Sequence, residues 1–97
     1  MITIISRHYC KAEKLDESKQ LLNKAGFAQS KFKGFLSRQT LQSQVNHLEL
    51  VTLTSWESKD DQQQWFNSEE RQQTTGPSKT GSFWGKPPEQ EFLNILG

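Results

Sequence analysis

The chain has 97 residues, with 12 basic and 11 acidic side chains that leave a formal charge of +1 at pH 7. One domain spanning residues 1–97 accounts for this length, and the lack of a basic stripe argues against a nucleic-acid partner. The hydrophobic share is only 32%, and even with glycine counted it stays below the ~45–50% of ordinary domains. A core this thin favours pairing with a second copy, so we expect a homodimer.

The cysteine count and the start of the chain bear on the compartment. The single Cys10 has no partner for an internal disulfide, and the chain shows no charged-then-apolar leader and no long apolar run. We therefore expect a cytoplasmic protein with no membrane partner. Cys10 is interpreted as a structural residue rather than a reactive thiol, because no activating group can be assigned beside it.

The first half of the chain predicts a strand, a helix and a second strand. Residues 1–9 alternate as a strand does, and isoleucine on both faces predicts a central position in a sheet. Residues 16–25 carry an apolar stripe typical of a helix, and Gly26 is expected to end it by adopting a left-handed conformation. After a loop, residues 35–41 predict the second strand.

The second half repeats this order. A polar hairpin over 42–46 leads to a strand at 48–56, which is rich in β-branched and aromatic residues. Ser58 is a good N-cap, and the run to Arg71 lacks glycine and proline, so one helix is expected there. Residues 74–88 hold all three prolines and predict an irregular loop, followed by a last strand at 91–96.

This order of elements is β-α-β-β-α-β, which indicates an α+β ferredoxin-like fold with an antiparallel sheet and both helices on one face. We also expect the first and third strands to run side by side in parallel. At ~3.3 Å per residue that arrangement separates His8 from His47 by roughly 20 Å, so no metal site is predicted from the two histidines.

A family resemblance appears in the segment 52–69. Its strand ends in Trp56, Glu57-Ser58-Lys59 follow, and Trp65 and Ser68-Glu69 lie on the helix. Together with Gly34-Phe35 at the start of a strand, this pattern resembles the antibiotic biosynthesis monooxygenase domain family and its heme-degrading relatives. The resemblance implies a dimeric α/β barrel, in which two sheets pack through the faces that carry no helix.

The resemblance also implies an activity. Cofactor-independent members oxidise a phenolic or polycyclic aromatic molecule that lies between sheet and helices, is deprotonated, and reduces O2 directly as a carbanion. The alternative is a dimeric domain that binds a small molecule, or is associated with stress, without turnover. Catalytic candidates are Trp65, Ser6, His8 and Arg38, and substrate-binding candidates are Trp65, Phe66, Thr52, Phe83 and Trp84.

Heme degradation is not expected. The heme-degrading relatives use an Asn, a Trp and a His, and the matching positions here are Ser6, Trp65 and Thr75. A threonine offers no nitrogen ligand to heme iron, so we expect no heme and no other cofactor. Trp65 itself has two compatible interpretations, as a core tryptophan and as the wall of a cavity.

Two further features of the second half leave alternatives open. Three consecutive glutamines, Gln62 to Gln64, indicate either a lightly packed helix or a polar cavity, whereas the acids at both ends of that helix are best explained as solvated charges. The loop that carries Phe83 and Trp84 also contains Gly76, Gly81 and Gly85. It is either a lid over a cleft or a plug that covers the end of a small core.

Overall fold

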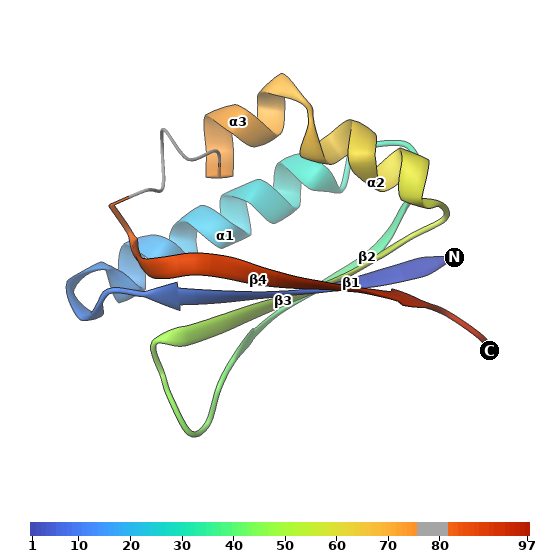
Figure 1. The fold of residues 1–97 in the computed structure, drawn as a ribbon. Helices are drawn as coiled ribbons and strands as arrows, with labels where there is room; N and C mark the ends of the chain where they lie inside the picture. The colour runs from blue at the N-terminus through green and yellow to red at the C-terminus, as the bar shows by residue number, and fades with distance from the viewer. Residues whose placement is uncertain (76–81) are drawn as a thin grey trace.

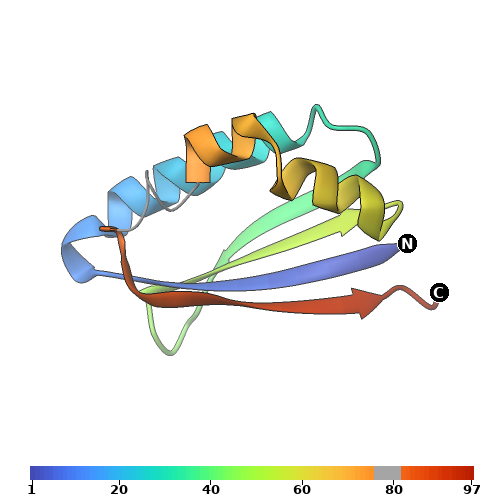
Figure 2. The ribbon, with the colours of Figure 1, turned by 45° about the horizontal axis from the view of Figure 1, so that its top comes forward.

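Four antiparallel strands form a sheet, and all the helices cover one of its faces (Figures 1 and 2). The computed structural model describes residues 1–75 and 82–97. The strand order is β2-β3-β1-β4, which confirms the predicted α+β ferredoxin-like fold and the central place of the first strand. The strands are β1 (Ile2–Cys10), β2 (Phe35–Gln42), β3 (Glu49–Trp56) and β4 (Trp84–Asn94).

The predicted parallel pairing of the first and third strands is wrong. β1 and β3 are antiparallel, with His8 opposite Leu50. In this topology the second strand of each β-α-β unit is parallel to the first, and the strand inserted between them runs the opposite way. His47 precedes β3 and therefore lies at the same end of the sheet as His8.

The sheet face beneath the helices is apolar at its two ends and polar in its middle. At one end, Ile4 and Trp56 form a buried cluster with Trp65. At the other end, Cys10 and Leu50 cluster with Leu22 from the first helix. The buried positions between these two clusters carry only hydroxyl groups, on Ser6, Thr52 and Thr54. The core is thus divided, and the middle of the sheet is a polar floor.

The first long helix does not end where predicted. After a short turn of 3-10 helix, η1 (Ala12–Lys14), helix α1 (Leu15–Gln29) continues through Gly26. A Cβ atom added to Gly26 would lie 2.5 Å from Nε of Arg38. Gly26 therefore makes room for a side chain from the sheet, a requirement that the local sequence does not reveal.

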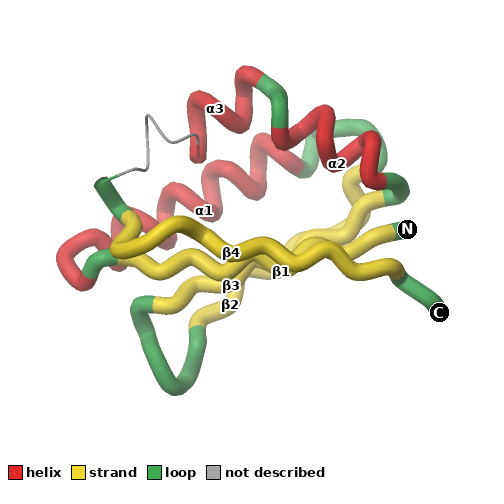
Figure 3. The backbone as a smooth tube through the Cα atoms, in the orientation of Figure 1, coloured by secondary structure: helices red, strands yellow, loops and turns green. Residues whose placement is uncertain are grey.

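The single helix expected up to Arg71 is two helices, α2 (Lys59–Phe66) and α3 (Glu69–Thr75) (Figure 3). Ser58 caps α2 as predicted, because its Oγ accepts a hydrogen bond from the backbone N–H of Asp61 at 3.1 Å. Ser68 does the same for Arg71 at 3.1 Å. This second cap starts α3 in a new direction.

The last strand begins earlier than predicted and includes two prolines. β4 starts at Trp84, whereas the sequence placed residues 74–88 in a loop. Arg7 pairs with Glu89 and Tyr9 with Lys86, so Pro87 and Pro88 together lie opposite His8 in a bulge. Prolines are tolerated here because β4 is an edge strand and a bulged residue needs no ladder hydrogen bond.

The opposite face of the sheet carries no helix (Figure 1). Its middle is apolar, with Leu53 between Ile5 and Gln39 in the register, and Leu41 and Leu93 are 44% and 40% exposed. Ionic and polar side chains, including Arg7 and its partners Glu49 and Glu91, lie beside this apolar area. In the described parts of the chain, no helix has the length and apolar character needed to span a bilayer.

Candidate functional site

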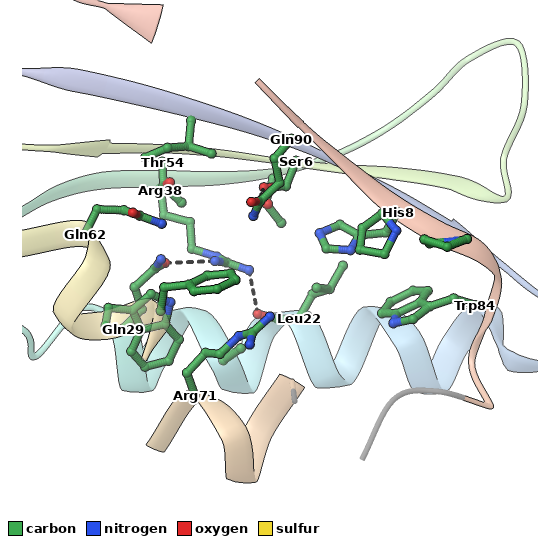
Figure 4. Close-up of a pocket in the computed structure, with 17 residues that line it drawn as sticks. Ser6, His8, Leu22, Gln29, Arg38, Thr54, Gln62, Arg71, Trp84 and Gln90 are labelled. Carbon is green, nitrogen blue, oxygen red and sulfur yellow. Dashed lines mark hydrogen bonds between the residues drawn. The ribbon is translucent and has the colours of Figure 1, made fainter. Parts of the chain in front are cut away.

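A cavity of about 330 Å³ lies over the polar middle of the sheet, between the two apolar clusters (Figure 4). Strands β1, β2 and β3 form its floor, the three α-helices form its walls, and the bulged edge of β4 closes one side. Its described lining residues are Ile4, Ser6, His8, Leu22, Ala25, Gln29, Arg38, Thr52, Thr54, Gln62, Trp65, Phe66, Arg71, Trp84, Pro87, Pro88 and Gln90.

The cavity collects almost all the residues that the sequence singled out. Every catalytic candidate lines it, together with Thr52, Phe66 and Trp84 from the binding set. Phe83 is the exception among the described residues. It precedes β4 and packs edge-on against Trp84, with the two ring centroids 6.4 Å apart. Their roles in binding or catalysis remain predictions.

Arg38 is the most constrained of these side chains. It extends from β2 into the cavity, where Nη1 donates to Oε1 of Gln29 and Nη2 donates to the carbonyl of Leu22, both at 2.8 Å (Figure 4). Both acceptors are uncharged groups of α1. Burial lowers the pKa of Arg38 to about 10, so the guanidinium remains protonated at neutral pH.

Arg71 brings a second cation to the cavity from α3. Its guanidinium carbon lies 4.2 Å from the ring centroid of Phe66, a cation–π geometry that fixes the plane of both groups. Burial lowers the pKa of Arg71 as well. Arg71 was not predicted as a site residue, because it points inward only as a result of the helix break at Ser68. Ser68, as a possible N-cap, was the sequence signal that could have indicated this break.

His8 is the titratable group inside the cavity. Its ring lies 5.1 Å from that of Trp84, and its buried Nδ1 atom has no hydrogen-bond partner among residues 1–75 and 82–97. Burial lowers the pKa of His8 to about 4, and the nearby charges of Arg38 and Arg71 add to this effect. His8 is therefore neutral at pH 7, a state in which an imidazole nitrogen accepts a proton.

Trp65 combines its two predicted interpretations. It is 6% exposed, and it packs edge-on against Phe32 with ring centroids 5.1 Å apart, so it belongs to the core. It also lines the cavity. The glutamine run is resolved in the same way: Gln62 is buried and lines the cavity, which confirms the polar-cavity alternative for that residue.

Gln29 and Gln90 were not anticipated from the sequence. Gln29 enters because α1 continues past Gly26. Gln90 lies opposite Ser6 in the register, and its Nε2 donates to Oγ of Ser6 at 3.3 Å. No local sequence signal identifies either glutamine, because their positions depend on where α1 ends and where β4 begins.

The heme-type triad and the histidine pair can also be placed. Ser6 and Trp65 line the same cavity, whereas the side chain of Thr75 lies outside the described part of the chain. His47 is exposed in the β2–β3 turn, and His8 faces the cavity. Across residues 1–75 and 82–97, no group of three or more His, Cys, Asp or Glu side chains could hold a metal ion.

The loop proposed as a lid is shorter than expected. Trp84 and Gly85 belong to β4, and Trp84 packs partly against the cluster of Cys10, Leu22 and Leu50. Gly76 and Gly81, the other two glycines of the predicted hinge, lie outside the described residues. Trp84 thus has the contacts of a partly buried core residue and also forms one end of the cavity.

Comparison with known proteins identifies one family. Residues 1–75 match the family model described as antibiotic biosynthesis monooxygenase. No curated protein sequence matches the chain. Among solved structures, a putative antibiotic biosynthesis monooxygenase from Nitrosomonas europaea superposes with a TM-score of 0.89 at 14% identity, with all of both chains covered.

Two further structures show the same likeness. Rv0793 from Mycobacterium tuberculosis has a TM-score of 0.88 at 17% identity, covering 99% of this chain and 95% of that one. SnoaB, a cofactor-independent oxygenase from Streptomyces nogalater, has a TM-score of 0.85 at 10% identity, covering 99% and 93%. At these identities the likeness establishes the shared fold.

Proposed function

The chain belongs to the antibiotic biosynthesis monooxygenase family, and on that premise we propose that it is a cofactor-independent monooxygenase acting on a small phenolic or polycyclic aromatic molecule. The observation that carries this proposal is the cavity of about 330 Å³, which holds a neutral histidine beside aromatic walls and two cations. We also propose that residues 1–97 form a single domain and that the protein is cytoplasmic, as predicted from the sequence.

The proposed reaction uses only the substrate, O2 and side chains of the chain. A base removes a proton from an acidic C–H of the substrate, and the resulting carbanion transfers one electron to O2. The substrate radical and superoxide combine into a peroxide, which takes up the proton and loses water to leave a ketone. One O2 is consumed, one oxygen atom enters the product, and the other leaves as water.

The cavity residues have distinct roles in this scheme. His8 is the proposed base, because its imidazole is neutral at pH 7 and its buried Nδ1 has no hydrogen-bond partner among the described residues. Arg38 and Arg71 stabilise the negative charge that develops on the substrate after deprotonation. Trp65 and Phe66 hold the flat face of the ring, and Ser6 and Thr52 are polar contacts on the floor.

A second candidate function is binding without turnover. It is favoured by the Ser6 and Thr75 positions, where the heme-degrading relatives carry an Asn and a His. The same cavity and the same ligand class serve both functions. They differ in whether His8 transfers a proton.

Oxygen uptake tests the proposal. The purified protein is mixed with an anthrone, whose CH2 between two aryl rings is acidic, in a buffer containing a metal chelator. We expect uptake above the spontaneous rate, with one O2 consumed per quinone formed. His8→Gln is expected to abolish the enhancement, and His47→Gln, an exposed control, should keep it. Binding of the anthrone without enhanced uptake would favour the second function.

The assembly proposed for this domain is a homodimer joined through the sheet face that carries no helix. The apolar middle of that face supports this assembly, because Leu93 is exposed and Ile5 and Leu53 are only partly buried. A twofold contact would bury the same patch on both copies. It would leave the cavity of each copy on its own helical side.

A further inference from the structure

The described residues that line the cavity include no acid to balance the charge of Arg38. Arg38 and Arg71 both line it, and the described lining residues include neither Asp nor Glu. Placing a cation out of contact with water is costly unless an opposite charge or several hydrogen bonds compensate. Arg38 therefore presents a positive charge to a ligand that enters the cavity.

Arg38 shows this imbalance most clearly. Its hydrogen bonds use two of the five N–H groups of the guanidinium, and both acceptors, on Gln29 and Leu22, are neutral. In the described part of the chain no ion pair joins Arg38 to an acid, whereas Arg7 and Lys14 do form ion pairs. Donors thus remain for a further acceptor.

The guanidinium is also held in place before any ligand arrives. The carbonyl of Leu22 and the buried amide of Gln29 hold it from one side, and the backbone of Gly26 lies directly against Nε. A group fixed in this way loses little conformational freedom on binding a partner. Planar, bidentate recognition of a carboxylate is the task to which a fixed guanidinium is best suited.

The remaining surface of the cavity fits an aromatic ring. Trp65 and Phe66 supply apolar faces, and Arg71 stacks on Phe66 with its guanidinium carbon 4.2 Å from the ring centroid. The volume of about 330 Å³ lies at the small end of the range for small-molecule sites. It accommodates a ligand of two or three fused rings.

We propose that the ligand of this cavity is a small aromatic carboxylate, whose carboxylate pairs with Arg38 and whose ring lies against Trp65 and Phe66. This inference rests on the proposed function, because it concerns the same cavity, and it narrows the substrate class from aromatic molecules in general to anionic ones. The carboxylate anchors the molecule and leaves the ring to react beside His8.

A matched pair of ligands tests the proposal on the unaltered protein. 1-Hydroxy-2-naphthoate and its neutral carboxamide have nearly the same shape and differ in charge. Calorimetry under nitrogen measures binding without any oxidation. We expect the carboxylate to bind about ten- to a hundredfold more tightly, as for a charge-assisted hydrogen-bonded pair. Equal affinity, tighter binding of the amide, or no binding of the carboxylate at millimolar concentration would overturn the proposal.

A variant then assigns the preference to one residue. Arg38→Gln should bring the affinity for the carboxylate down to that for the carboxamide and leave the carboxamide little changed. Lys24→Gln is the matched control, since it removes one positive charge from the exposed side of α1. It should keep the full preference. If Arg38→Gln keeps the wild-type preference for the carboxylate over the carboxamide, Arg38 has only a structural role, in linking β2 to α1.

The result is separable from the oxygenase test. Binding under nitrogen reports on charge recognition alone, and oxygen uptake with the neutral anthrone reports on turnover alone. A carboxylate preference without uptake supports this inference and contradicts the oxygenase. Oxygen uptake without a carboxylate preference supports the oxygenase and contradicts this inference.

Discussion

At the scale of single residues, the cavity is defined by polar groups placed where a core would normally be apolar. His8, Arg38 and Arg71 approach the same space from β1, β2 and α3 (Figure 4). Each carries a cost of burial, seen in the lowered pKa of all three. Several perturbed titratable groups in one cavity mark a candidate functional site.

His8 makes stability depend on pH. Its pKa falls from 6.5 in the unfolded chain to about 4 in the fold, so between these values the unfolded chain binds a proton that the folded one does not. The free energy of unfolding is therefore highest above pH 6.5 and should fall by about 3 kcal/mol as the pH drops to 4.

Urea denaturation at several pH values measures this fall. His8→Gln should flatten the curve between pH 6.5 and 4, and His47→Gln, in an exposed turn, should leave it as in the wild type. An equal pH dependence in wild type and His8→Gln would contradict the burial of an uncharged His8.

Trp84 is expected to contribute to both stability and binding. Its ring packs partly against the cluster of Cys10, Leu22 and Leu50 and also lies against His8. Trp84→Ala should cost about 2–3 kcal/mol of unfolding free energy, less than a fully buried tryptophan, and should weaken binding of 1-hydroxy-2-naphthoate. Phe83→Ala, which does not reach the cavity, is the control for binding. A stability change within about 1 kcal/mol with weakened binding would instead fit the lid hypothesis.

At the scale of elements, α1 and β2 are joined by a glycine and an arginine. Gly26 lies inside α1, where alanine would normally stabilise by about 1 kcal/mol. Here a methyl group would meet Nε of Arg38 at 2.5 Å. Gly26→Ala should therefore fail to stabilise the protein and should weaken carboxylate binding.

The sign of this effect should invert when the arginine is absent. In an Arg38→Ala background, Gly26→Ala should raise the free energy of unfolding by about 1 kcal/mol, because only the helix propensity remains. A four-variant denaturation series measures both values. Equal effects of Gly26→Ala in the two backgrounds would show that the two residues are independent.

Features with a local cause were predictable from the sequence, and features with a tertiary cause were not. The Ser58 cap and the alternation in β3 were predictable, because each depends on residues within one turn or strand. The passage of α1 through Gly26 was not, because its cause is a side chain on another element. The bulge at Pro87–Pro88 was not predictable, because prolines are typical of loops and only pairing with β1 identifies this segment as an edge strand.

The sequence predicted several residues that line the cavity, but not the electrostatic character of the cavity. Trp65, His8 and Arg38 were identified from their faces and from the family resemblance. The positive character of the cavity was not predicted, because Arg71 enters only through the break at Ser68. The number of charges is evident from the sequence, but it does not reveal that Arg38 forms no ion pair with an acid among the described residues.

At the scale of the whole molecule, one sheet separates two surfaces of different character. The helices cover one side of the sheet (Figure 2), and the cavity lies on that side, whereas the other side carries partly exposed apolar residues around Leu53. We expect a homodimer in sedimentation at micromolar concentration. Leu53→Glu should dissociate it, because two like charges would face each other at the proposed contact, whereas Leu96→Glu, at a 96% exposed position, should not. A monomeric wild type, or a dimer unaffected by Leu53→Glu, would contradict the sheet-to-sheet assembly.

The central claim is that the polar cavity between the sheet and the helices is where this protein binds its ligand. A crystal structure of the protein with 1-hydroxy-2-naphthoate tests it most directly. The account predicts the ring between Trp65 and Phe66 and the carboxylate within hydrogen-bond distance of the Arg38 guanidinium. A naphthoate bound on the open face of the sheet, or a cavity filled only with water at saturating ligand, would contradict it.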